Sequence, residues 1–280
     1  MTAGHARVLV VGAGSPNPAF LAETLRLNGI SAERTGNVAL PNPFLIRRFN
    51  IVYGIYLQSC SRYIVVGKLL GKKTVIHFVG SDAYWFARER SILRRLYWII
   101  VLRLTDHIFY VSPHLEALTG RRGTILPLPI ATDSFREARL GLRKPDRDVL
   151  YYCPSGRDNE RIYRLSWILE YAASHPEQKV TILGSSSHPA QYKLGLPNVL
   201  VVPFIETSKM PDFYRRHKRL IRMTTEDGLP QMIHEAVLAG LEVYFNGEKV
   251  QKVPEERERS YFASTFKATL GMGAEEHSRS

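Results

Sequence analysis

The chain has 280 residues, of which 45% are apolar, 10% aromatic and 23% charged. This composition supports a compact core and excludes an intrinsically disordered chain or a collagen. At about 150 residues per domain, the length predicts two small domains. Lys and Arg number 38 and Asp and Glu 26, which leaves a formal net charge of +12. Such an excess points to nucleic acid, an anionic membrane surface or a phosphorylated ligand as partner.

The first half alternates between expected strands and helices. An apolar run over residues 7–11 enters the loop GAGSP, as a buried parallel strand does, and residues 19–27 have helical spacing. Short apolar runs follow at residues 64–66, 74–78 and 107–111, separated by helical or polar stretches. This alternation predicts an α/β fold with a parallel sheet.

The second half repeats the pattern after a polar stretch, residues 142–148, that lacks periodicity. We place the boundary there, between an N-terminal domain of residues 1–141 and a C-terminal domain of residues 142–280. A last helix is expected after Pro254. Two tandem Rossmann-like units imply a cleft lined by the loops at the carboxyl ends of the strands. Further strands are expected at residues 149–152, 179–183, 199–202 and 220–223.

Cysteine usage and the length of the apolar runs bear on the compartment. Cys60 and Cys153 stand 93 positions apart without a CxxC spacing, so neither a disulfide framework nor a zinc site is indicated. The longest apolar run, residues 96–102, is far shorter than the roughly 20 residues that span a bilayer. We therefore expect a cytoplasmic protein, either soluble or peripheral on the inner face of the membrane.

The basic excess lies in the first half: residues 1–140 carry a net charge of +10 and residues 141–280 one of +2. No nucleic-acid-binding signature accompanies it, so no nucleic acid is expected as a partner. Around the helical axis the densest charges form no single stripe, which predicts an exposed basic turn followed by a buried helix. This turn is either a solvated helix end or a weak contact with anionic lipid. Its arginines are Arg88, Arg90, Arg94 and Arg95.

The most informative stretch is DGLPQMIHEAVLAG, residues 227–240. Pro230 suits the first position of a helix and Gly240 its end, with good helix formers between them. Backbone N–H groups in the approach to this helix attract anions. A phosphate is therefore expected over Gly228 and Leu229.

Two carboxylates accompany this helix, Asp227 in the loop and Glu235 eight positions on. They suit two ends of a polyhydroxylated ligand; the alternative is an ordinary helix cap and a helix-surface Glu. The stretch resembles the donor-site segment of family-4 retaining glycosyltransferases with the GT-B fold, where an acid, a Gly-Leu-Pro or Gly-Phe-Gly loop and a helix Glu-Ala have this spacing. The resemblance covers residues 149–245 well and the first half loosely.

This resemblance implies two Rossmann-like domains facing across a cleft, with the nucleotide-sugar donor held by the second. Arg157 and Arg161, four positions apart, would hold the nucleotide diphosphate through their guanidinium groups; the alternative is an exposed surface pair. Glu235 would bind the ribose hydroxyls and Asp227 the transferred sugar. The first acid of that family is usually Glu, so Glu226 is the alternative to Asp227.

The resemblance gives roles to four further loops. It places Gly184 beside the nucleotide, and His77 and Asp82 towards the sugar or the acceptor; the alternative for His77 is a structural residue at a strand end. Gly12 and Gly14 flank a loop of small residues that allows a backbone approach to a phosphate or sugar. Without the resemblance, GAGSPN is a weak dinucleotide fingerprint, which favours an NAD(P)-dependent oxidoreductase as an alternative.

Many sugar transferases of another fold bind a metal ion through an Asp-x-Asp pair. Asp146 and Asp148 have this spacing, yet Arg separates them and they precede a strand, so a solvated turn is expected. Arginines and helix N-termini are expected to neutralise the donor phosphates instead. We therefore expect no metal and no cofactor besides the nucleotide-sugar substrate.

Together these features predict a glycosyltransferase of the hexosyltransferase class. It would move a sugar from a nucleotide-sugar to an acceptor, with retention and without metal. Because the basic excess lies in the half that would receive the acceptor, a lipid-linked or membrane-associated acceptor is favoured. The alternatives are a catalytically inactive nucleotide-binding protein of the same fold and, less favoured, the NAD(P)-dependent oxidoreductase, with Arg34 near a 2′-phosphate.

Overall fold

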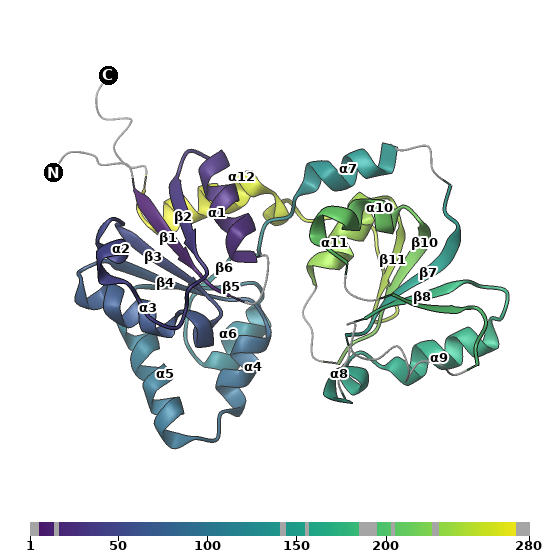
Figure 1. Ribbon diagram of the computed structural model, residues 1–280, viewed down its shortest axis with the longest axis horizontal. Coiled ribbons are helices and arrows are strands. Elements are labelled where there is room, and N and C mark those ends of the chain that lie inside the picture. The colour runs from purple at the N-terminus through teal and green to yellow at the C-terminus, as the bar shows by residue number, and fades with distance from the viewer. Residues whose placement is uncertain are drawn as a thin grey trace. The chain divides into compact units, whose positions relative to one another are not determined.

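A computed structural model divides the chain into two compact units (Figure 1). Unit 1 runs to Pro129 and resumes at Glu255, and unit 2 spans Ile130–Pro254. This division differs from the expected boundary after residue 141, because Phe135, ahead of that boundary, is buried in the core of unit 2. The structure describes residues 6–13, 17–140, 144–154, 157–184, 195–202, 205–225 and 230–272.

Unit 1 contains a six-stranded parallel sheet with the strand order β2-β1-β3-β4-β5-β6. Its central strands are near-continuous runs of buried apolar residues, as expected of a parallel sheet covered on both faces. The strands are β1 (Arg7–Val11), β2 (Ser31–Thr35), β3 (Ile51–Ile55), β4 (Lys73–Phe78), β5 (His107–Tyr110) and β6 (Thr124–Ile125).

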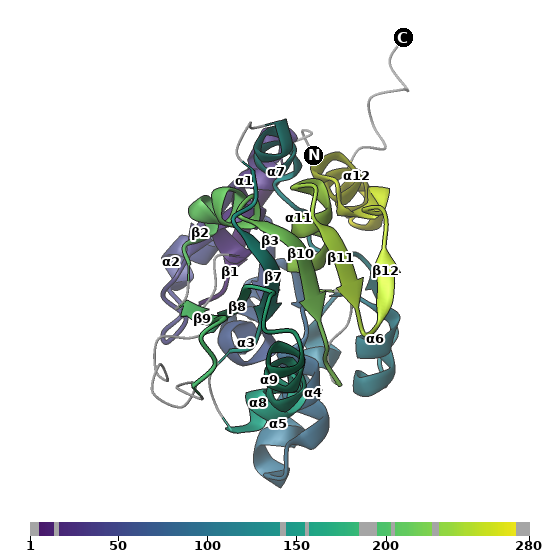
Figure 2. The same cartoon turned by 90° about the vertical axis from the view of Figure 1, so that its right-hand side faces the viewer.

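Helices cover both faces of this sheet (Figures 1 and 2). Val8 and Val10 of β1 pack with α1 and α12, whereas Leu9 and Val11 pack with α3 to α6, since successive strand residues face opposite sides. The helices are α1 (Asn17–Leu27), α2 (Pro43–Arg47), α3 (Leu57–Leu69), α4 (Ser81–Arg88), α5 (Ile92–Leu104), α6 (Pro113–Thr119) and α12 (Arg259–Thr269).

The C-terminal helix α12 belongs to unit 1, although a place in the second domain was expected. The Phe266 ring lies 5.4 Å from the Tyr53 ring and 6.1 Å from the Phe109 ring, centre to centre. Arg259 stands over the Phe20 ring of α1 at 4.5 Å. The aromatic face of α12 therefore completes the core of unit 1, a contact that adjacency in sequence does not reveal.

The run at residues 64–66 lies within α3 and not in a strand, so that expectation was wrong. Cys60 and Ile64, one helical turn apart, are buried against the sheet. The strand beside β1 is β3, where a Cβ on Gly54 would lie 2.4 Å from Cys60 Cβ, which explains the glycine. The strands expected at residues 7–11, 74–78 and 107–111 are confirmed.

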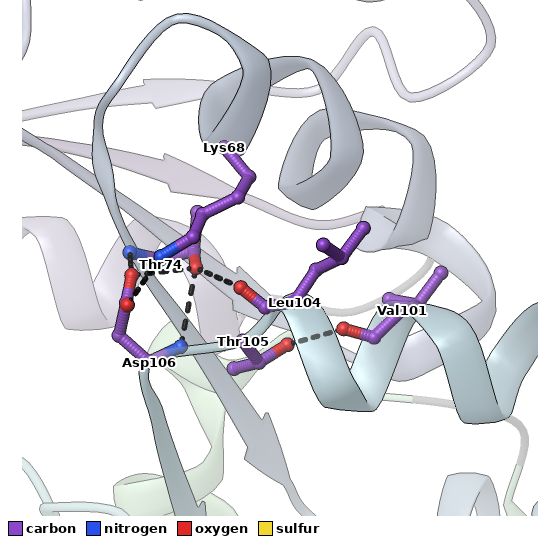
Figure 3. A network of polar contacts seen from close by, with 6 residues as sticks. All are labelled: Lys68, Thr74, Val101, Leu104, Thr105 and Asp106. Atoms are coloured by element: carbon purple, nitrogen blue, oxygen red, sulfur yellow. Dashed lines mark hydrogen bonds and ion pairs between the residues drawn. The ribbon is translucent and has the colours of Figure 1, made fainter.

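A polar network fixes the end of α5 to the sheet (Figure 3). The Thr74 hydroxyl on β4 donates to the carbonyl of Leu104 at 3.1 Å, and Asp106 accepts from the Thr74 N–H at 2.8 Å. Lys68 of α3 pairs with the same carboxylate. Burial opposes ionisation, but the Lys68 and Thr74 donors hold the pKa of Asp106 below its ordinary value. The carboxyl end of α5 is thus attached to α3, β4 and β5.

Unit 2 contains a six-stranded sheet with the order β12-β11-β10-β7-β8-β9, parallel except for β12. All four strands expected in this half are confirmed. The strands are β7 (Arg147–Tyr152), β8 (Val180–Leu183), β9 (Val199–Val202), β10 (His217–Arg222), β11 (Glu242–Phe245) and β12 (Glu248–Val250).

The helices of unit 2 include the one expected from the motif stretch. It begins after Pro230, ends at Leu238 and is followed by Gly240 with φ +86°, a left-handed conformation that suits glycine at a helix end. The helices are α7 (Thr132–Leu140), α8 (Arg157–Ile162), α9 (Leu165–Ser174), α10 (Met210–Tyr214) and α11 (Gln231–Leu238), with 3-10 turns at Thr207–Lys209 and, in unit 1, at Glu255–Arg257.

Candidate functional site

The carboxyl edge of the unit 2 sheet carries the residues expected to bind the donor. The neighbouring strands β7 and β10 end here at Tyr152 and Arg222, followed along the chain by α8 and α11. The Thr225 N–H donates to the carbonyl of Ile162 at the end of α8 over 3.0 Å, which ties the two strand exits together. Ligands of open α/β sheets bind at this edge.

Arg222, the last residue of β10, is a buried positive charge at this edge, with 3% of its surface exposed. Its guanidinium carbon lies 4.8 Å from the Tyr152 ring centre and 4.9 Å from that of Tyr163, and Nη1 lies 2.9 Å from the sulfur of Met232. Two aromatic faces stabilise the buried cation. Arg222 is absent from the sequence-based expectations because a lone Arg in LIRM looks like part of an apolar strand.

Glu235 is buried in α11, so the helix-surface alternative for it was wrong. The Tyr214 hydroxyl of α10 donates to its carboxylate at 3.0 Å. Burial raises the pKa of Tyr214 well above its ordinary value; Glu235 raises it further and Arg222 opposes the shift. Tyr214 therefore stays protonated and orients the carboxylate. We name Tyr152, Tyr214, Arg222 and Glu235 the β10–α11 cluster.

Asn246 fixes the path of the chain as it leaves β10. Its side-chain oxygen accepts from the Thr224 N–H at 2.8 Å, and its own N–H donates to the carbonyl of Arg222 at 2.9 Å. Asn246 has φ +50°, a left-handed conformation that Asn adopts more readily than most residues. The exit of β10 is thus held from the end of β11, which keeps Arg222 in place.

The remaining expected donor residues fall into two groups. Arg157 and Arg161 both belong to α8, as the spacing predicts, and Arg161 is exposed. Gly184 follows β8, and a Cβ there would lie 2.9 Å from the carbonyl oxygen of Cys153, so close packing accounts for this glycine. The second group lies outside the described residues and comprises Gly14, Glu226, Asp227, Gly228 and Leu229.

His77 lies in the core of unit 1, beneath α12. Its Nδ1 is 2.5 Å from the Tyr53 hydroxyl, and its ring stacks on Phe262 at 6.4 Å. Burial lowers the pKa of His77 to about 3, so the ring is neutral at physiological pH. This position favours the structural alternative for His77 over a role facing a sugar.

Asp82 sits in the first turn of α4, at the carboxyl edge of the unit 1 sheet, and is also buried. Its Oδ1 accepts from the N–H groups of Val79 and Gly80 at 3.1 and 3.0 Å. Burial raises the pKa of Asp82 to about 6, although these hydrogen bonds oppose the shift. Gly12 lies at the same edge, where a Cβ would lie 2.7 Å from Pro18 Cγ. Both residues thus serve the packing of unit 1.

The Asp-x-Asp pair lies at the amino end of β7, opposite the edge that carries the β10–α11 cluster. Asp146 pairs with Arg216 at 3.4 Å, and Asp148 pairs with Lys218 at 2.7 Å and accepts from the Lys179 N–H at 2.9 Å. These carboxylates are therefore used in ion pairs within the sheet and contribute nothing to the candidate site.

The basic cluster spans the end of α4, the following turn and the start of α5, and its arginines are exposed. The helix after it is not buried as expected. Trp98, Val101 and Leu102 of α5 pack on unit 1, whereas Ile92 and Leu93 are 81% and 80% exposed. The apolar run alone could not distinguish a helix buried all round from one with a second apolar face. In the described part of the chain, no helix combines the length and hydropathy needed to cross a bilayer.

Two Rossmann-like units, each built on a six-stranded sheet, define the GT-B fold class. Sucrose-phosphate synthase from Thermosynechococcus elongatus is similar at 16% identity and a TM-score of 0.58, covering 95% of this chain and 90% of that one. HepE from Anabaena, solved in complex with UDP-glucose, is similar at 14% identity and a TM-score of 0.58, with the same coverage.

A third structure of this class has another activity in its name. The UDP-GlcNAc 2-epimerase from Neisseria meningitidis, bound to UDP-GlcNAc, is similar at 12% identity and a TM-score of 0.56, covering 95% of this chain and 91% of that one. No protein-family model matches the sequence, and no curated protein sequence matches it either. At such identities the likeness establishes the GT-B glycosyltransferase-like fold alone.

Proposed function

We propose that this chain is a glycosyltransferase that binds a nucleotide-sugar in unit 2 and transfers the sugar to an acceptor bound by unit 1. The observation that carries the proposal is the β10–α11 cluster, a buried cation and a buried carboxylate at the ligand-binding edge of the sheet. HepE, a protein of the same fold, was solved with UDP-glucose and with UDP, which supports a nucleotide-sugar as the ligand.

Within this proposal the residues of unit 2 divide the donor between them. The Glu235 carboxylate, oriented by Tyr214, accepts hydrogen bonds from the ribose hydroxyls. Arg222 attracts the diphosphate from behind the strand exit, where a low dielectric strengthens the attraction. Arg157 and Arg161 of α8 contribute further positive charge, and Asp227 binds the transferred sugar.

We propose transfer with retention and without a metal ion. The bond between the anomeric carbon and the β-phosphate oxygen breaks, and the acceptor oxygen bonds to the same face of the sugar. The acceptor proton passes to the leaving phosphate, so no protein nucleophile is required. The arginines of unit 2 neutralise the charge that develops on that phosphate. Full activity in EDTA is the expected result, and loss of activity that Mg²⁺ or Mn²⁺ restores would contradict it.

The acceptor is proposed to be lipid-linked or otherwise associated with a membrane. The support is the distribution of charge, since residues 1–140 carry +10 of the net charge of +12. A positive surface favours acceptors presented among anionic lipids. Unit 1 would accordingly face the membrane from the cytoplasmic side.

The test incubates the protein with UDP-glucose, UDP-GlcNAc, GDP-mannose and ADP-glucose in the presence of extracted anionic lipids. Release of nucleoside diphosphate together with sugar in the lipid phase is the expected result. An epimerised nucleotide-sugar, detected by NMR without release of nucleotide, would instead identify an epimerase, the activity named for the Neisseria structure. Binding of nucleotide-sugar with neither product would identify an inactive binding protein.

A further inference from the structure

Exposed apolar side chains gather on α4 and α5 of unit 1. Ile92 and Leu93 are 81% and 80% exposed, and Trp85 on α4 is 65% exposed. Leu96 and Ile100 continue the same side of α5, at 52% and 46%. Large side chains that are singly exposed are ordinary, but a contiguous set marks a surface that binds something apolar. We name these five residues the α4–α5 ridge.

The four ridge residues of α5 form a second apolar face of this helix, separate from the one that packs on unit 1. Ile92, Leu96 and Ile100 recur every four residues and so form one stripe along the helix. Trp98 and Val101 lie on the other side and are buried. A helix that needed only to cover its own domain would carry polar residues on its outer face.

The ridge is held in place by its attachment to the sheet. The carboxyl end of α5 is fixed by the network of Thr74, Leu104 and Asp106. From this anchor α5 runs away from the sheet in Figure 1, and a short turn joins its projecting end to α4. The amino-terminal half of α5 therefore projects from the sheet, which suits a broad surface better than a peptide.

Four arginines lie near the amino-terminal end of the ridge. Arg94 and Arg95 lie in the first turn of α5, Arg88 ends α4 and Arg90 lies in the turn between them; each is exposed. Of the nearby acids, Asp82 is buried, and Glu89 pairs with Arg94 at 3.1 Å and so offsets one of the four arginines. An apolar stripe with exposed arginines near its amino-terminal end complements the acyl boundary and the phosphates of anionic lipids.

We propose that the α4–α5 ridge docks the protein on an anionic lipid bilayer, with Ile92, Leu93 and Trp85 in the boundary between headgroups and acyl chains and the arginines on the lipid phosphates. The inference deepens the proposed function, since it rests on a membrane-associated acceptor and names the surface that reaches it. The test of membrane docking needs no sugar transfer. Failure of docking would therefore leave the proposed glycosyltransferase activity intact, and loss of that activity would leave docking intact.

The test is flotation of the whole chain with two kinds of vesicle. One is phosphatidylcholine alone, and the other contains about 30 mol% phosphatidylglycerol, an anionic fraction large enough to attract several basic side chains. The expected result is binding at least about tenfold stronger to the anionic vesicles. Ile92→Ser with Leu93→Ser should weaken it at least about tenfold, because both side chains lose their apolar contact. Leu69→Ser, a matched control 81% exposed on α3, should leave it unchanged.

A charge-reversed pair separates electrostatic from apolar binding. Arg90→Glu with Arg95→Glu should weaken binding to anionic vesicles at least about twentyfold, because each basic side chain contributes about fivefold at such a surface. Arg26→Glu with Arg34→Glu makes the same change in net charge at exposed positions of unit 1 away from the ridge, and should cost less than about a fourth of that effect.

Tryptophan fluorescence gives a direct readout of contact with lipid. Trp85 is exposed, whereas Trp98 is buried and Trp167 belongs to unit 2. A blue shift on anionic vesicles that disappears in Trp85→Phe is the expected result. Equal binding to both vesicle types, no binding by the folded chain, or a dimer in light scattering that Ile92→Ser with Leu93→Ser dissociates would overturn the proposal, the last by making the ridge a contact between protein chains.

Discussion

The two units use their buried charged groups differently, although both are six-stranded Rossmann-like sheets. In unit 1, Asp82 closes a tight turn and neutral His77 lies among aromatic rings, so both serve the packing. In unit 2, Arg222 stands at the end of β10 and Glu235 in the middle of α11, each with partners that orient it. The comparison teaches that sheets of one fold can hold buried polar groups in different settings: in the packing of unit 1, and at the strand edge of unit 2 that we propose as the donor site.

The largest expected effect is that of Arg222→Met. It removes two buried cation–π contacts, of about 2 kcal/mol each when desolvated, so unfolding in urea should require about 4 kcal/mol less free energy. Donor binding should weaken as well. Arg219→Met on the same strand, where Arg219 forms a 4.0 Å surface pair with Glu242, should cost less than about 1 kcal/mol. Equal losses of unfolding free energy in the two variants would contradict a specific stabilising role of Arg222.

The next effect concerns unit 1 and the pH dependence of its stability. The pKa of Asp82 is raised by burial from 3.8 to about 6, so between these values the folded chain binds more protons than the unfolded one. The Asp82 carboxyl therefore lowers the free energy of unfolding as pH rises through that window. The total loss is about 3 kcal/mol, since each unit of pKa difference corresponds to about 1.4 kcal/mol. Asp82→Asn should remove that slope.

The control for Asp82→Asn is donor binding, which should stay within about twofold because the residue packs unit 1 and lies outside the proposed donor site. Denaturant unfolding at pH 4 and pH 7 measures the slope, and calorimetry measures the affinity. A variant that keeps the slope, or one that loses donor binding, would show that Asp82 has a different role from the one its hydrogen bonds indicate.

The smallest expected effect belongs to Glu235→Gln. The amide keeps the size of the side chain and a partner for Tyr214 but removes the negative charge, so donor affinity should fall about tenfold, as for one charge-assisted hydrogen bond. The matched control is Glu170→Gln, on the exposed face of α9 in the same unit. A loss shared by both variants would contradict a specific role for Glu235.

Much of the fold was predictable because buried parallel strands are apolar runs that end in Gly or polar loops, as at residues 7–11 and 180–183. The run at 64–66 was not, since three apolar residues fit a strand and a helix equally. The place of α12 could not be read either, because its aromatic residues pack on strands about 200 positions away in sequence.

The candidate site was predictable only in part. Glu235 followed from the motif spacing, whereas Arg222 needed the structure, because its meaning comes from Tyr152 and Tyr163 on other elements. The exposed face of α5 was missed for a related reason: Ile92 and Leu93 have the composition of a buried helix, and only the position of the sheet shows which side is covered.

The most direct test of the central claim is calorimetric titration of the whole chain with UDP, GDP and ADP, without any acceptor. The account predicts saturable binding of one of these diphosphates, unchanged by EDTA, weakened at least about tenfold by Glu235→Ala and unaffected by Glu170→Gln. Absence of binding to all three by the folded protein, or equal affinities in both variants, would contradict a donor site built on the β10–α11 cluster.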